Sequence, residues 1–219
     1  GSYPGFFGEM ENISGNIDFA GKDIIFKDIQ GSQDGIMAYI HGNTDIHNNV
    51  LTNVYMDMPV VPLPHAKMFI DNSSIMKKVS HSLKGIINPV GNISLNMSLV
   101  YDKTMTEPLV KGTVKVVDGS CEVEGLAYRA NNVTGKVDFT NAQSDIDFEG
   151  TVYDTYTKLT GIARANYSDL YIYNPNTDVT LRDYLYSYLS YQNSNYAYQI
   201  AQGQLETDLI AKATIKYFN

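Results

Sequence analysis

Alternation of apolar and polar residues is the strongest pattern along this chain. In residues 93–99, Ile-Ser-Leu-Asn-Met-Ser-Leu, large apolar side chains alternate with small polar ones. This spacing puts four apolar side chains on one face of an extended strand. The same alternation recurs in residues 17–19, 54–58, 114–116, 137–139, 145–149 and 209–215. Most of the chain is therefore predicted to be β-strand.

A glycine followed two residues later by Ile, Val or Leu begins many of these segments. The motif occurs at Gly15, Gly91, Gly112, Gly135, Gly150 and Gly203. Where these glycines are closest, from 112 to 135 to 150, the steps are 23 and 15 residues, which suits antiparallel neighbours. A glycine at a similar level of many strands lets a sheet curl sharply along that line. The unequal steps argue against a solenoid with identical turns.

Residues 58–67 break the alternation. Pro59, Pro62 and Pro64 remove three backbone donors from this stretch, which excludes it as a central strand. We expect a crossing loop or a sheet edge here.

Two later segments have helical spacing. After Asp71, Asn72 and Ser73, which suit an N-cap, apolar residues recur at helical intervals with lysines between them, so we expect a helix over 73–85. This helix would either cap an end or edge of the sheet or lie on the surface as a crossover. Residues 180–183 resemble a capping box, but the tyrosines that follow also alternate, so both helix and strand fit 181–191.

Composition narrows the range of functions. Lys and Arg number 16 against 24 Asp and Glu, a net charge of −8, so the chain lacks the basic face that nucleic acids need. The chain is 43% hydrophobic and has 17 Tyr, which is typical of a folded protein. Its single Cys cannot form an internal disulfide or a cysteine-based zinc cage. No apolar run is long enough to predict a transmembrane helix.

The chain begins with Gly1-Ser2, which is typical of a protease cleavage scar. We expect residues 3–219 to be a single segment cut from a longer chain.

Catalytic and metal motifs are not evident in the sequence. His41, His47, His65 and His81 lack the spacing of metal ligands. We therefore expect no metal site, no cofactor and no catalytic residue, and we place an enzyme last among the possible functions.

Two other groups of residues have both a functional and a simpler explanation. Asp145, Asp147 and Glu149 share a strand face opposite Ile146 and Phe148, which favours a solvated polar side over a carboxylate site. The tyrosines of residues 184–198 suit packing more often than stacking on sugars.

The repeated texture of several segments resembles the AsmA-like superfamily, most closely its TamB-type members. The segments are residues 15–31, 37–42, 83–95, 110–119, 133–139 and 150–152. This resemblance covers nearly the whole chain. Its motifs are glycines followed by alternation rather than invariant catalytic residues.

The resemblance implies an elongated, strongly bent antiparallel sheet, a β-taco, with an apolar groove that holds lipid acyl chains. It also implies a periplasmic segment of an inner-membrane-anchored envelope protein that conducts phospholipid toward the outer membrane. The expected partners are a phospholipid or another acyl-chain lipid and an outer-membrane protein. The family supplies no catalytic residues.

Thirteen apolar strand residues are the candidate lining of this groove. They are Ile17, Phe19, Ile93, Leu95, Met97, Leu99, Val114, Val116, Val137, Phe139, Ile146, Phe148 and Val152. Alternation alone favours a dry core in an ordinary sandwich or β-helix, and the resemblance is what favours the groove.

Three function classes therefore remain: a lipid-conducting groove, a closed structural or adhesive β domain, and a glycan-binding module. A glycan module would carry exposed aromatics flanked by Asp, Asn or Arg on a convex face.

Overall fold

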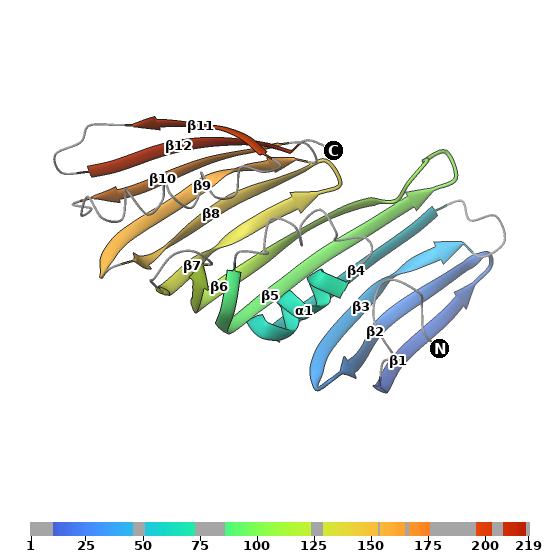
Figure 1. The fold of residues 1–219 in the computed structure, drawn as a ribbon. Coiled ribbons are helices and arrows are strands. Elements are labelled where there is room, and N and C mark those ends of the chain that lie inside the picture. Colours follow the sequence, from blue (N-terminus) through green and yellow to red (C-terminus); the bar gives the residue numbers. More distant parts are fainter. Residues whose placement is uncertain are drawn as a thin grey trace.

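The computed structural model describes residues 11–45, 51–72, 86–123, 129–152, 154–164, 167–175, 196–202 and 208–217. Within these ranges the protein is a single antiparallel sheet with one short helix (Figure 1). The strands are β1 (Glu11–Ala20), β2 (Asp23–Gln33), β3 (Ile36–Asp45), β4 (Leu51–Pro62), β5 (Ile86–Asp102), β6 (Leu109–Val123), β7 (Arg129–Thr140), β8 (Gln143–Val152), β9 (Thr155–Arg164), β10 (Tyr167–Pro175), β11 (Tyr196–Gln202) and β12 (Asp208–Tyr217). The helix α1 spans Leu63–Asn72.

The sheet follows the order of the chain for most of its width. Strands β1 to β10 are neighbours in sequence order, β12 pairs with β10, and β11 lies outside β12. The described strands therefore leave β1 at one edge and β11 at the other, and they form an open sheet of 12 strands.

The predicted strand segments are confirmed. Each alternating segment lies inside a strand, and the best one, residues 93–99, lies in the 17-residue β5. Long central strands agree with the alternation because each residue added to a strand continues the same two faces.

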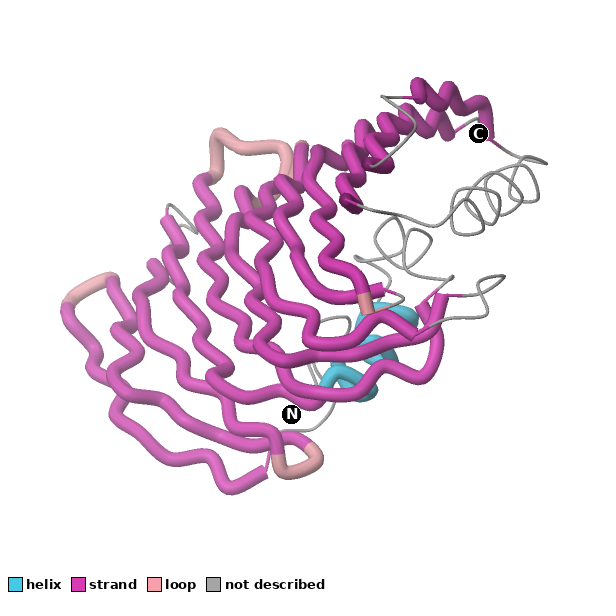
Figure 2. The backbone as a smooth tube through the Cα atoms, turned by 90° about the vertical axis from the view of Figure 1, so that its left-hand side faces the viewer, coloured by secondary structure: helices cyan, strands magenta, loops and turns pink. Residues whose placement is uncertain are grey.

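β-Bulges interrupt the ladders at related levels of several strands. Each of five bulges contains an Asn or Asp in the left-handed conformation, with φ between 48° and 55°: Asn12, Asp28, Asn88, Asp118 and Asn132. A bulge bends its strand and increases the local twist. The central strands accordingly curve part-way along their length, so one face of the sheet is concave (Figure 2).

Four of these bulges have a common sequence signature. Asn12, Asp28, Asn88 and Asn132 are each followed three residues later by glycine. The glycine motif in the sequence includes Gly15, Gly91 and Gly135, but neither Gly31 nor the preceding Asn and Asp residues. Asn and Asp adopt the left-handed conformation at lower cost than other side chains, which explains their place in the bulges.

The expectation for residues 58–67 was wrong in part. This segment is the end of β4 followed by the start of α1. The prolines are tolerated because β3 pairs with β4 only as far as Asp57, and the pairing with β5 shifts register between Met58 and Val61. Pro64 falls in the first turn of α1, where a helix needs no amide donor. The end of β4 is therefore an edge locally, although β4 is internal to the sheet.

Helix α1 packs on the concave face of the sheet (Figure 2). Its Ala66 is buried in one cluster with Met58, Val61, Ile93 and Val116, and Leu63 packs against the same cluster. The helix expected over 73–85 and the 181–191 segment lie outside the described residues.

Candidate functional site

Strand register puts all thirteen candidate lining residues on one face of the sheet. Directly paired residues of an antiparallel ladder point to the same side. Leu95 pairs with Val114, Val114 with Val137, and Val137 with Ile146, which connects four strands in one row. The rows at Ile93, Met97 and Leu99 run parallel to it, and the ladders from β5 through β4, β3 and β2 reach Ile17 and Phe19.

This apolar face is the concave one, because it is the face on which α1 packs. Burial is greatest near the helix, where Ile93, Met97 and Val116 are each at most 8% exposed. Toward the β1 edge the same face opens, and Phe19 is 75% exposed. Among the described elements, α1 makes most of its contacts with β4 and β5. Outside the buried cluster, most apolar side chains of this face are half-buried or exposed.

The structure adds residues to this face that the sequence had not placed there. Ala38, Met56, Met58 and Val61 belong to its most buried cluster. The alternation of 54–58 already contained Met56 and Met58, but the prolines obscured the continuation to Val61. Ala38 did not stand out in the sequence, because the alternation was recognised from large apolar side chains and alanine is small.

Two phenylalanines of this face each pack over a glycine of the preceding strand. A side-chain carbon on Gly112 would lie 2.6 Å from Cζ of Phe139, and one on Gly135 would lie 2.6 Å from Cδ1 of Phe148. Gly112 is paired with Phe139, and Gly135 with Phe148. The motif glycines thus leave room for aromatic rings to lie flat along the concave face.

The opposite, convex face is polar. Asp145, Asp147 and Glu149 are exposed there, as the sequence indicated. Lys158 lies 3.4 Å from Asp147, and the Tyr156 hydroxyl donates to Glu149 at 2.9 Å. That hydrogen bond to a carboxylate raises the pKa of Tyr156.

A second polar group on this face surrounds Asp138. Its carboxylate accepts hydrogen bonds from Lys136 Nζ and Thr113 Oγ1, each at 2.6 Å. These bonds favour the ionised form and lower the pKa of Asp138, the Lys136 bond most. The group is therefore an ion pair within β7 that the hydrogen bond from Thr113 connects to β6.

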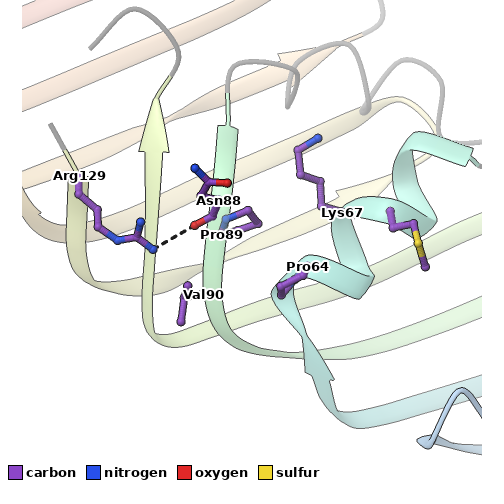
Figure 3. A pocket seen from close by; sticks show the side chains of 7 residues that line it. Pro64, Lys67, Asn88, Pro89, Val90 and Arg129 are labelled. Atoms are coloured by element: carbon purple, nitrogen blue, oxygen red, sulfur yellow. Dashed lines mark hydrogen bonds between the residues drawn. The ribbon is translucent and has the colours of Figure 1, made fainter. Parts of the chain in front are cut away.

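An open cavity lies where α1 meets the bent ends of β5 and β7 (Figure 3). Pro64 and Met68 of the helix, Pro89 and Val90 of β5, and Arg129 of β7 line it. Arg129 donates to the Asn88 carbonyl at 3.0 Å and to Glu122 at 2.9 Å. It also donates to Ser120 Oγ from both Nε and Nη2. Since these bonds join β5, β6 and β7, Arg129 holds the bend together.

The histidines are scattered rather than clustered. His41 is exposed on β3, His65 lies in α1, and His47 and His81 fall outside the described residues. Across the described ranges, no group of three His, Cys, Asp or Glu side chains is placed to hold a metal ion. No described helix is long and apolar enough to cross a membrane.

The tyrosine-rich stretch 184–198 lies mostly outside the described residues, and only its last three residues, in β11, are placed.

Comparison with known proteins adds no relative. No family model, curated protein or solved structure matches the chain.

Proposed function

We propose that the concave apolar face is a groove that carries phospholipid acyl chains, in a β-taco segment of an envelope protein. In this proposal the segment is periplasmic, belongs to a protein anchored in the inner membrane, and passes lipid toward the outer membrane with an outer-membrane protein as a partner. The location and the protein partner rest on the sequence resemblance alone. The groove rests on the residues themselves.

One observation carries the groove. One face of the described strands from β1 to β10 is largely apolar, although it also carries polar side chains such as the hydrogen-bonded pair Asn174 and Thr157. Among the described residues, the short helix α1 covers the middle of this face. In a sandwich, a second sheet would cover this face at a distance of about 10 Å. The described strands instead belong to one sheet.

Hydration energetics favour an apolar occupant for such a face. Covering apolar surface contributes roughly 25 cal/mol for each Å², or about 1.5–3 kcal/mol for a fully covered Ile or Phe side chain. Side chains such as Ile17 and Phe19 are more than half exposed, so most of that contribution is still available there. An acyl chain supplies flexible apolar surface and needs no hydrogen bonds, which suits a largely apolar lining.

A closed structural or adhesive domain is the alternative. It predicts that the apolar side chains form a dry core in which an unpaired charge would unfold the domain. In an open groove, a charge can be hydrated once lipid has left, so the cost is smaller. The two functions therefore differ in how the protein tolerates a charged side chain on the concave face.

The test replaces one residue on each face of the same strand. Ile146→Arg puts a charge on the concave face away from α1, and Asp145→Arg puts the same side chain on the exposed convex face. Each purified variant is examined for its melting temperature and, by native mass spectrometry and lipid extraction, for co-purified phospholipid. We expect both variants to fold, and only Ile146→Arg to lose lipid.

Two results would reject the groove. Unfolding of Ile146→Arg while Asp145→Arg remains folded would indicate a dry core. Equal lipid content in both variants would show that the concave face does not hold the lipid. Absence of lipid from the unaltered protein would likewise reject lipid binding.

A further inference from the structure

A cluster of aromatic and polar side chains lies on the convex face, away from the groove. Tyr39 and His41 are alternate residues of β3, and Tyr55 of β4 pairs with His41. Tyr39 and Tyr55 are each about two-fifths exposed. We propose that this aromatic patch, Tyr39, His41 and Tyr55, binds a neutral oligosaccharide. The proposal does not rest on the lipid groove.

The patch offers a flat stacking surface. The rings of His41 and Tyr55 are stacked, with centroids 5.0 Å apart and planes 13° from parallel. Tyr55 approaches from β4, so it covers one side of the His41 ring. The other side of that ring lies toward β2. Aromatic faces of this kind accept the apolar C–H face of a sugar ring.

A hollow lies on that open side of His41. Besides His41, its lining includes Asp23, Asp28 and Asn43 together with Ile25. The hollow forms because Asp28 occupies a bulge, so β2 and β3 lose direct pairing opposite His41. Lys27 also lines it, but its ammonium is paired with Asp18 at 2.6 Å. The hollow therefore combines an aromatic wall with carboxylate and amide groups that bind sugar hydroxyls.

The chemistry of the patch favours a neutral sugar over charged ligands. The carboxylates of Asp23, Asp28 and Asp57 border the patch, and they would repel phosphate groups. A polyamine would bind the carboxylates but would leave the side-chain amide of Asn43, which lines the hollow, without a role. Aromatic rings beside Asp and Asn combine a stacking surface with hydrogen-bonding groups for hydroxyls, which suits a neutral sugar.

The experiment titrates neutral hexasaccharides into the protein and follows binding by calorimetry and by NMR shifts of backbone amides. Chitohexaose, cellohexaose, maltohexaose and laminarihexaose are the probes, and spermidine is the cationic comparison. We expect at least one sugar to bind in the millimolar range or tighter, with shifts centred on residues 39–43 and 53–57. Tyr55→Ala should weaken that binding about tenfold, because it removes one ring of the stack.

Tyr171→Ala is the matched control. Tyr171 is 40% exposed on the same face but lies on β10, outside the patch, so its loss should leave binding unchanged. His41→Phe preserves a ring at the wall and should retain binding. The proposal is overturned if no sugar binds at millimolar concentration, if spermidine alone binds, or if Tyr171→Ala weakens binding as much as Tyr55→Ala.

Discussion

Among single residues, the glycines beneath Phe139 and Phe148 allow neighbouring strands to lie close together. Gly135 has φ of 154°, a conformation that other residues rarely adopt. A side-chain carbon there would also overlap the Asp147 carbonyl and the backbone of Phe148. Both the backbone conformation and the space therefore require glycine at this position.

Gly135→Ala should consequently destabilise the protein by about 2–4 kcal/mol, because it adds backbone strain and a steric overlap with the neighbouring strand. Chemical denaturation would measure the loss. Gly35→Ala is the control, since Gly35 also has a positive φ but nothing lies within 4 Å of the added carbon. Its cost should be about 1–2 kcal/mol, that of the conformation alone. Equal losses for the two variants would show that strand approach is not the cause.

The ion pair at Asp138 predicts a pH dependence. The pKa of Asp138 is lowered from its ordinary value of 3.8, chiefly by the hydrogen bond from Lys136. A carboxyl with a depressed pKa in the folded state stabilises the protein above its ordinary pKa, and this contribution disappears as the pH falls through the folded value. Asp138→Asn should lower the free energy of unfolding by less than about 1 kcal/mol at pH 7, because the pair is largely exposed. Paired melting curves at neutral and strongly acidic pH should show that difference vanish in acid; an unchanged difference would contradict the assignment.

At the scale of elements, the bend depends on bulges and on one arginine. The bulges at Asn88, Asp118 and Asn132 interrupt the ladders of β5, β6 and β7 near the same end of the sheet. Arg129 then joins these strands through hydrogen bonds to the Asn88 carbonyl, Ser120 and Glu122. Ladder pairing alone would leave this end weakly connected, since several backbone groups at a bulge lack a direct partner.

Arg129→Ala should therefore destabilise the protein by about 1–3 kcal/mol. It should also accelerate hydrogen exchange of amides in residues 86–92 more than in residues 93–99. Arg129→Lys is the informative control, because lysine keeps the charge but cannot donate from a planar fork to three groups. We expect lysine to restore less than half of the loss. Full rescue by lysine would mean that charge alone matters at the bend.

Much of this architecture could be predicted from the sequence, because alternation follows directly from the two-residue period of a strand. The prediction made from the prolines of residues 58–67 was wrong in part. Whether a strand tolerates a proline depends on which neighbouring strand is paired at that level, and the sequence does not show this. Asn132 and its equivalents carried a signal in the sequence, an Asn or Asp three residues before glycine. The aromatic patch could not be predicted, because His41 and Tyr55 meet only through the register of β3 and β4.

At the scale of the whole molecule, the two faces of the sheet differ in chemistry. The concave face is largely apolar from β1 to β10, and the convex face carries ion pairs such as Lys27 with Asp18 and Lys158 with Asp147. A single layer with one apolar face exposes surface that a sandwich would cover. The stability of the proposed groove should accordingly depend on whether an apolar ligand is bound.

Removing bound lipid and adding it back would measure that dependence. A ligand that binds only the folded state stabilises it by about 2.7 kcal/mol when its free concentration is about 100 times Kd. For a chain of this size, that corresponds to a rise in melting temperature of about 5–10 °C. We expect this rise when delipidated protein is reloaded with dioleoylphosphatidylglycerol. Glycerophosphoglycerol, which has the head group without acyl chains, should cause none, and the Ile146→Arg variant should show a smaller rise. A melting temperature that is the same with and without lipid would show that the concave face is already covered, and the groove would have to be abandoned.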